Sequence, residues 1–271
     1  MLRWQTREGH LSWCDKLAST SGLVLELNVH HASGNSILDA MSPIFDRHRS
    51  RDGTGFELQK LEDFNVQFVT NEGYQYTVTP RTISIEYVYR IQVQYQSAGP
   101  PKAWVLSEII PYSAQLLEIS KRLMEVGSLF PDPKTRSIER ITVISQTNVD
   151  PDDLPPGIQR LLRYMGRPWS HELESYQTRV VASLGGDKVG NSIRCTHSIG
   201  KQQRPETKEP QVSDGLVNVR FDWQRKFKTG RRIEPKSMRE IVSESIKDAN
   251  QYFEELAEGN RFDENILTGT V

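Results

Sequence analysis

The chain has 271 residues, of which 36% are hydrophobic and 25% are charged, and its formal net charge is -1. This length can supply one large domain or two small ones with a substantial core, and the balanced charge argues against general affinity for nucleic acid. No apolar run approaches the roughly 18 residues that cross a bilayer, and the N-terminus lacks the apolar core of a signal peptide. Cys14 and Cys195 are too few for a disulfide framework. We therefore expect a cytoplasmic protein with reduced thiols and no membrane partner.

The first part of the chain alternates between strand and helix patterns. Residues 23–30 form the first expected strand, and residues 36–48 repeat apolar side chains at helical spacing. Ser36 or Asn35 is the expected cap of this helix, and Pro43 should end or kink it. From Phe56 onward the apolar residues recur at every second position. This change predicts a meander of antiparallel strands over residues 58–61, 64–70, 74–79 and 82–96.

The rest of the chain repeats this alternation. A strand is expected at residues 104–109, and Pro111 opens an expected helix that reaches residue 126. The remaining elements are strands at 137–147, 175–184, 191–199 and 215–227, and helices at 158–165 and 235–258. Residues 229–232 are expected to form a turn before the last helix, which Gly259 should end.

The order of the elements predicts the fold class. It is α+β, with antiparallel sheets and amphipathic helices packed on them. Residues 1–150 and 151–271 are expected to form two similar α+β halves, either as two units or as one compact domain. The last helix should pack on the strand before it, through Ile241, Ile246, Phe253 and Leu256 against Val219 and Phe221.

The order of elements resembles that of a sporadically distributed bacterial family of uncharacterised proteins. In that family a strand carries the pattern Arg-x-Gly-x-Arg-Tyr-x-Asn, and the chain ends with a strand and then a helix. The corresponding stretch here runs from Arg140 to Asn148 and keeps these two residues, while the glycine, the second arginine and the tyrosine are absent. The resemblance implies a bacterial or phage-related setting, often associated with mobile elements or defence, and supplies no catalytic residues.

Two groups of side chains have the residue types of chemical sites. His30 and His31, with Asp39 and His48 downstream, are metal-ligand types, but neighbouring strand residues point to opposite faces, which disfavours a shared metal. An exposed strand end is the preferred interpretation of the two adjacent histidines.

Cys195 and His197 share a strand face but lack a visible orienting group, so residues of a buried or half-buried strand are the preferred interpretation. Asp150, Asp152 and Asp153 are better explained as a turn that leads into a helix.

No motif for phosphate binding, nucleophilic catalysis or zinc hydrolysis occurs in the chain. The sequence thus predicts no catalytic residue, cofactor or metal, although a site assembled from distant strands leaves no motif.

The sharpest local feature is a basic segment at residues 220–239, followed by an acidic stretch at residues 240–265. Both placements oppose the dipole of the last helix, so helix stability does not explain them. A solvated surface is the ordinary explanation. The alternative is a partner-binding surface made by Arg225, Lys226, Lys228, Arg231 and Arg232.

A second basic cluster, at residues 47–51, flanks the first long helix. Trp223 and Phe227 are the only aromatic residues near the basic segment that could stack on bases.

Three functions were weighed on these observations. The first is a non-enzymatic accessory or regulatory protein that binds another protein through sheet edges and charged surfaces, in the bacterial defence or mobile-element setting that the resemblance implies. The first alternative is a nucleic-acid-binding accessory that uses residues 220–239. The second alternative is an enzyme with an unrecognised site.

Overall fold

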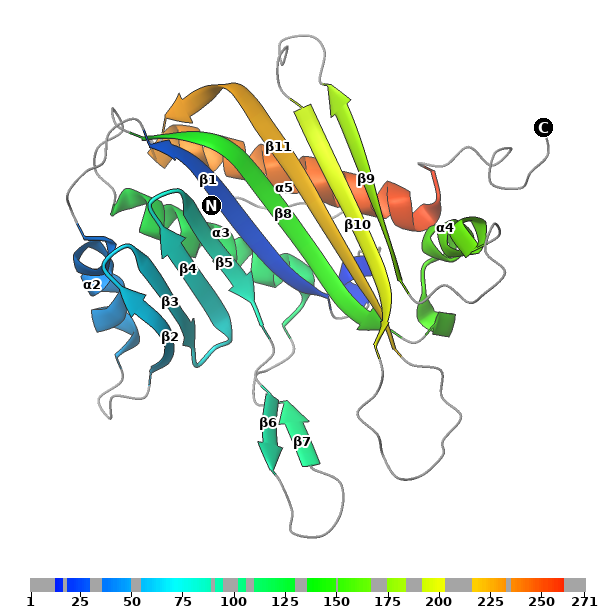
Figure 1. Ribbon diagram of the computed structural model, residues 1–271, viewed down its shortest axis with the longest axis horizontal. Coiled ribbons are helices and arrows are strands. Elements are labelled where there is room, and N and C mark those ends of the chain that lie inside the picture. The colour runs from blue at the N-terminus through cyan, green and yellow to red at the C-terminus, as the bar shows by residue number, and fades with distance from the viewer. Residues whose placement is uncertain are drawn as a thin grey trace.

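The computed structural model describes residues 13–16, 19–29, 36–49, 55–88, 91–94, 102–105, 110–129, 136–149, 151–166, 175–183, 192–202, 216–232 and 235–260. Nine strands of this described part form one antiparallel sheet, in the order β2-β3-β4-β5-β1-β8-β11-β10-β9 (Figure 1). The α+β class with antiparallel strands is therefore confirmed.

The bounds of the elements follow the predicted alternation closely. The strands of the large sheet are β1 (Thr20–Val29), β2 (Phe56–Glu62), β3 (Asn65–Thr70), β4 (Tyr74–Thr79), β5 (Thr82–Tyr87), β8 (Arg136–Val149), β9 (Ser175–Ser183), β10 (Ser192–Gln202) and β11 (Leu216–Arg232). A separate hairpin contains β6 (Ile91–Gln94) and β7 (Lys102–Val105). The helices are α1 (Trp13–Lys16), α2 (Ile37–His48), α3 (Tyr112–Ser128), α4 (Pro156–Gly166) and α5 (Pro235–Glu258), with a short 3-10 turn η1 (Pro151–Asp153).

The same order of elements occurs twice along the chain. In each half a strand (β1 or β8) is followed by a helix (α2 or α4), a meander (β2–β5 or β9–β11) and a second helix (α3 or α5). The last strand of each meander pairs antiparallel with the first strand of its own half. β1 and β8 also pair with each other, so one sheet runs through both halves.

Two strand predictions are wrong in detail. The expected single strand over residues 82–96 ends at Tyr87, and residues 91–94 instead pair with β7 in the separate hairpin. The expected turn at residues 229–232 is part of β11, which continues to Arg232 beside β8. Between Lys226 and Arg231 the register to β8 shifts, because β11 has more residues there than β8. The turn-forming residues are therefore accommodated within the strand.

The ends of the helices follow predicted local chemistry. Ser36 caps α2, and its Oγ accepts a hydrogen bond from the Asp39 amide at 3.3 Å. Pro43 lies inside α2 without ending it. Gly259 ends α5 with a φ of 88°, a left-handed conformation that favours glycine.

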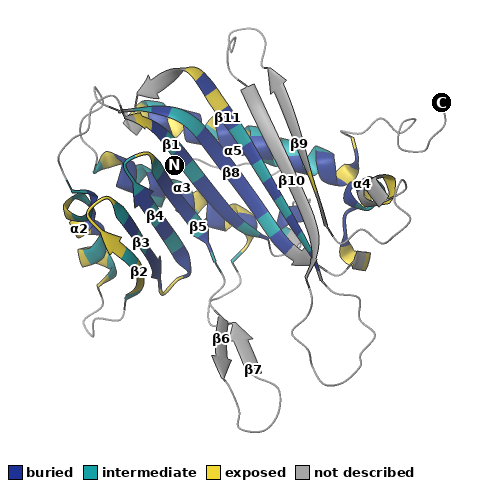
Figure 2. Ribbon diagram, viewed as in Figure 1, coloured by how far each residue is buried: buried dark blue, intermediate teal, exposed yellow. Residues whose placement is uncertain are grey.

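One face of the sheet carries the core. α3 and α5 lie behind the sheet in Figure 1, and the odd-numbered side chains on that side are buried from Ser21 to Leu27 of β1 and from Val217 to Phe227 of β11 (Figure 2). The ring of Phe253 on α5 stacks on Phe221 of β11, with centroids 5.6 Å apart. The four apolar residues predicted to anchor α5 all belong to this core, which confirms the predicted packing: Ile241, Ile246, Phe253 and Leu256.

A buried glutamine fixes α3 against β1. Gln115 Oε1 accepts hydrogen bonds from the amide and Oγ of Ser21 at 3.0 and 2.9 Å. Its Nε2 donates to the carbonyls of Ser19 and Ile110 at 3.1 and 2.7 Å. Because every polar atom of this buried side chain is paired, α3 has one favoured position on the sheet.

Candidate protein-binding surface

The side of the sheet away from the helices is polar along its central strands. Strand alternation directs to this side the even-numbered side chains of β1, those of β8 from Arg140 to Gln146 and those of β11 from Asn218 to Lys228, whereas Ile138 lies beyond a register shift and faces the core. In Figure 1 no described helix lies in front of these strands. We call this surface the polar sheet face and define it by Glu26, Arg140, Gln146, Arg220, Asp222, Gln224, Lys226 and Lys228.

Two arginines connect neighbouring strands on the polar sheet face. Arg140 of β8 pairs with Glu26 of β1 at 3.1 Å and donates to Gln224 of β11 at 3.3 Å. The Arg140 side chain is 23% exposed, so these bonds lie partly in solvent. Three strands are thus joined by one side chain, which holds the charges of this face in a fixed arrangement.

The second arginine, Arg220, connects two strands, β11 and β8. Arg220 of β11 donates through Nε to Asp222 at 3.0 Å and through Nη1 to Gln146 of β8 at 3.0 Å. Arg220 and Gln146 are direct partners in the strand register. Positive, negative and amide groups therefore alternate across the face, whose eight defining residues include four basic and two acidic side chains.

The predicted basic surface is split by strand alternation. Lys226 and Lys228 are exposed, and Lys226 pairs with Glu139 at 3.3 Å. Arg225 points to the opposite side, where it is 4% exposed and pairs with Glu244 of α5 at 3.2 Å. Its guanidinium also lies 5.2 Å from the centroid of the Phe227 ring. The expectation that Arg225 belongs to an exposed patch is therefore wrong. Arg231 and Arg232 continue β11, and their side chains lie outside the described residues.

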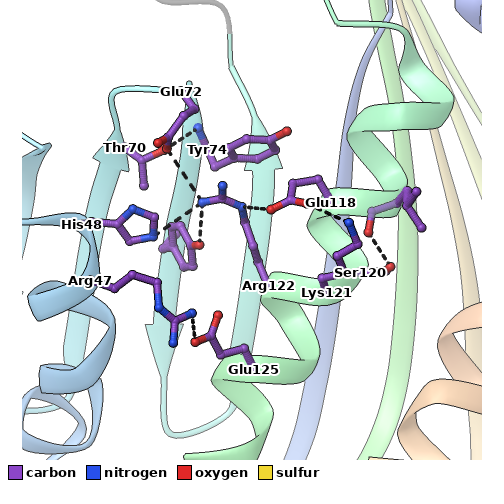
Figure 3. A network of polar contacts seen from close by, with 12 residues as sticks. Arg47, His48, Thr70, Glu72, Tyr74, Glu118, Ser120, Lys121, Arg122 and Glu125 are labelled. Carbon is purple, nitrogen blue, oxygen red and sulfur yellow. Dashed lines mark hydrogen bonds and ion pairs between the residues drawn. The ribbon is translucent and has the colours of Figure 1, made fainter. Parts of the chain in front are cut away.

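The second predicted basic cluster belongs to a joint between α2, α3 and the first meander (Figure 3). Arg122 of α3 lies at its centre, with its guanidinium 4.1 Å from the centroid of the Tyr74 ring. Arg122 donates to Glu118 at 3.0 Å and to the Tyr76 hydroxyl at 3.2 Å, and its Nη1 lies 3.5 Å from His48 Nε2. Arg47 of α2 pairs with Glu125 of α3, and Arg49 is exposed; residue 51 lies outside the described part.

The two tyrosines and the histidine of this joint are shifted toward their neutral forms, whereas the pKa of Arg122 is raised and that of Glu118 is lowered, which favours their charged forms. Burial raises the pKa of Tyr74 to about 12 and also raises that of Tyr76. Burial, and next the positive charge of Arg122, lower the pKa of His48. Tyr76 therefore stays protonated and can accept the hydrogen bond from Arg122, which suits a structural joint.

The described residues do not gather the candidate metal ligands. Asp39 and His48 lie nine residues apart on α2, which is about 13 Å along a helix. His30 and His31 lie outside the described residues. No group of three side chains that could hold a metal occurs in the part of the chain that the structure describes.

One cysteine lies in helix α1 and the other in strand β10. Cys14 is buried in α1, and its Sγ lies 3.3 Å from Ser145 Oγ. Burial raises its pKa to about 12, which keeps it a thiol at neutral pH. The register places positions 195 and 197 of β10 opposite Trp223 and Phe221, and their side chains lie outside the described part.

Sequence reasoning missed Glu26, Arg140, Gln146 and Gln224 as surface residues that act together. The signal is clear along β11, where polar and apolar residues alternate, and weaker along β1 and β8, where Val24 and Ile144 stand at positions of the polar face. What the pattern lacked was the strand order that brings β1, β8 and β11 side by side.

These features define a class of protein: an α+β scaffold with helices on one side of a continuous antiparallel sheet and charged side chains on the other. No protein-family model matches the chain, and no curated protein matches it. Among the described helices, none combines the length and the apolar character needed to cross a membrane.

Proposed function

We propose that this chain is a non-enzymatic accessory or regulatory protein that binds another protein through the polar sheet face. The observation that supports this proposal is the Glu26–Arg140–Gln224 bridge across three strands. Side chains fixed before binding lose little conformational entropy when a partner docks, so such a face can recognise a partner with specificity. The bacterial defence or mobile-element setting implied by the resemblance is part of the same proposal.

The charge of the face favours a protein partner over nucleic acid. Glu26 and Asp222 accompany Arg140 and Arg220, and Lys226 is already paired with Glu139. A nucleic-acid surface needs an excess of positive charge along the phosphate backbone. Here acidic partners accompany three of the four basic side chains of the face, which favours a protein partner with both signs of charge.

The buried reactive groups support a binding role over catalysis. The Cys14 thiol has a pKa of about 12 and lies in the core, where a substrate has no access. Arg122 and Tyr76 serve each other as hydrogen-bond partners within the joint. Such groups stabilise a scaffold and leave recognition to its surface.

The test is a comparative capture experiment in a lysate of the cells that encode the chain. The double variant Lys226→Glu/Lys228→Glu changes two exposed charges at the polar sheet face and should lose at least tenfold of the captured partner. The matched control is Lys121→Glu/Lys247→Glu, which reverses two exposed charges on α3 and α5 and should retain the partner.

Circular dichroism must show the same thermal unfolding for both double variants, so that misfolding does not cause the loss. Nuclease treatment before capture separates the alternatives, because a nucleic-acid bridge would be destroyed by it. Equal capture by both variants would refute the proposed surface.

A further inference from the structure

The free edge of the sheet at β2 carries an unusual group of exposed apolar side chains. Leu58 and Leu61 are each 48% exposed and Phe64, in the turn after β2, is 54% exposed. They are the three most exposed large apolar residues in the described part of the chain. β2 is the first strand in the sheet order, and β3 is the one described strand that pairs with it. Edges with exposed apolar residues are sites of strand addition.

A bulge gives β2 an arrangement of faces that is symmetric along the strand. The register to β3 shifts between Leu58 and Lys60. Glu57 and Lys60 stand opposite Val69 and Gln67, which are two residues apart on β3, so Glu57 and Lys60 share the side away from the helices.

The apolar residues share the other side of β2. Phe56, Leu58 and Leu61 stand opposite Thr70, Phe68 and Val66, the alternate positions of β3 that are buried toward the helices. Residues 56 and 61 therefore share one side and residues 57 and 60 the other, so these positions are symmetric about a centre between Leu58 and Gln59.

This symmetry allows the strand to pair with itself. We propose that two copies of this chain associate through antiparallel pairing of their β2 edges. In the proposed register Glu57 stands opposite Lys60 of the second copy, Phe56 opposite Leu61 and, at the centre, Leu58 opposite Gln59, each twice. The Gly55 carbonyl accepts a hydrogen bond from the Asn71 amide, so it points to β3. Alternation then directs the backbone groups of Phe56 and Leu58 to the free edge, where the second copy would pair.

Charge selects this register over its neighbours. A shift by one residue sets Glu57 opposite Leu61 of the second copy, which places polar and apolar positions against each other. A shift by two restores the faces but sets Glu57 opposite Glu62 of the second copy, a repulsive pair. The proposed register replaces that repulsion with two reciprocal Glu57–Lys60 pairs, in which each Lys60 also lies 3.3 Å from Glu62 of its own chain. It uses the far edge of the sheet, four strands from β1, and does not depend on the proposed function.

The test measures the mass of the full chain by analytical ultracentrifugation. At high concentration the wild type should have a sedimentation mass of about twice the 31.1 kDa of one chain. The variants Glu57→Lys and Lys60→Glu should each weaken the dimer at least tenfold when measured alone. An equimolar mixture of the two variants should restore the dimer, because opposite charges then meet at both reciprocal positions.

Two further variants separate edge pairing from other contacts. Leu58→Glu/Leu61→Glu should be monomeric, and Leu117→Glu, at a 38% exposed apolar residue on α3, should remain dimeric. A wild type that stays monomeric at every concentration would overturn the inference. It would also be overturned by a dimer that survives the Leu58→Glu/Leu61→Glu change, or by a charge-variant mixture that stays monomeric.

Discussion

Truncation of Phe253 to alanine tests how strongly α5 contributes to the core. The side chain is 1% exposed, and its ring stacks on Phe221 with the two planes 28° apart. Phe221 also makes an edge contact with Trp13, whose centroid is 5.6 Å away, so the cavity would open between three elements of the fold. Removing a buried phenylalanine ring costs about 3–5 kcal/mol of unfolding free energy, from lost transfer free energy and from the cavity.

The assay is urea unfolding followed by circular dichroism, with thermal unfolding as a second readout. For a chain of about this size each kcal/mol lowers the melting temperature by about 2–4 °C, so a decrease on the order of 10 °C is expected. The control Phe253→Leu fills most of the space and should cost less than about 1.5 kcal/mol. An unfolding free energy within about 1 kcal/mol of the wild type for Phe253→Ala would show that α5 is peripheral, against the large cost expected from cavity formation.

Three other predictions follow from buried polar groups. The pKa of His48 is lowered in the folded chain, so the folded state binds fewer protons than the unfolded state, and stability falls as pH drops below about 6.5 toward the folded pKa. Urea unfolding of His48→Gln between pH 7 and pH 5 should show a weaker pH dependence than the wild type, and equal slopes would contradict the lowered pKa. In a Cys195→Ser background, Cys14 should react with a thiol reagent at least tenfold more slowly in the folded chain than in urea, and fast labelling of folded chain would contradict its burial. Arg225→Met should keep stability within about 1 kcal/mol, because the remaining Glu244 is solvated, whereas Glu244→Ala leaves a buried guanidinium unpaired and should cost about 1–3 kcal/mol; the reverse order in urea unfolding would refute this reasoning.

The sequence by itself determined the class of the fold and most of its elements. Apolar spacing placed the last helix at residues 235–258, which are the bounds of α5, because a helix that covers a sheet needs a continuous apolar stripe. A cap at Ser36 or Asn35 and a stop at Gly259 followed from local backbone chemistry, and the structure has Ser36 as the cap. These features depend on residues near one another in the chain, so a pattern can reveal them.

The alternation of apolar and polar residues along β11 also predicts the side of the sheet on which Arg225 lies. The apolar residues of β11 stand at odd positions from Val217 to Phe227, and Arg225 falls in that series. Its burial was therefore encoded, whereas its partner Glu244 depended on how α5 crosses the sheet.

Only the tertiary structure decided which distant segments meet. Arg140 connects Glu26 and Gln224 because β8 lies between β1 and β11, an order that no local pattern specifies. Pairing with β8, which is distant in the sequence, also kept residues 229–232 in β11, and the pairing of residues 91–94 with β7 ended the predicted strand at Tyr87. The physical reason is that hydrogen bonding between strands is local in space but not in sequence, so the choice among possible partners is made by the packing of the whole sheet.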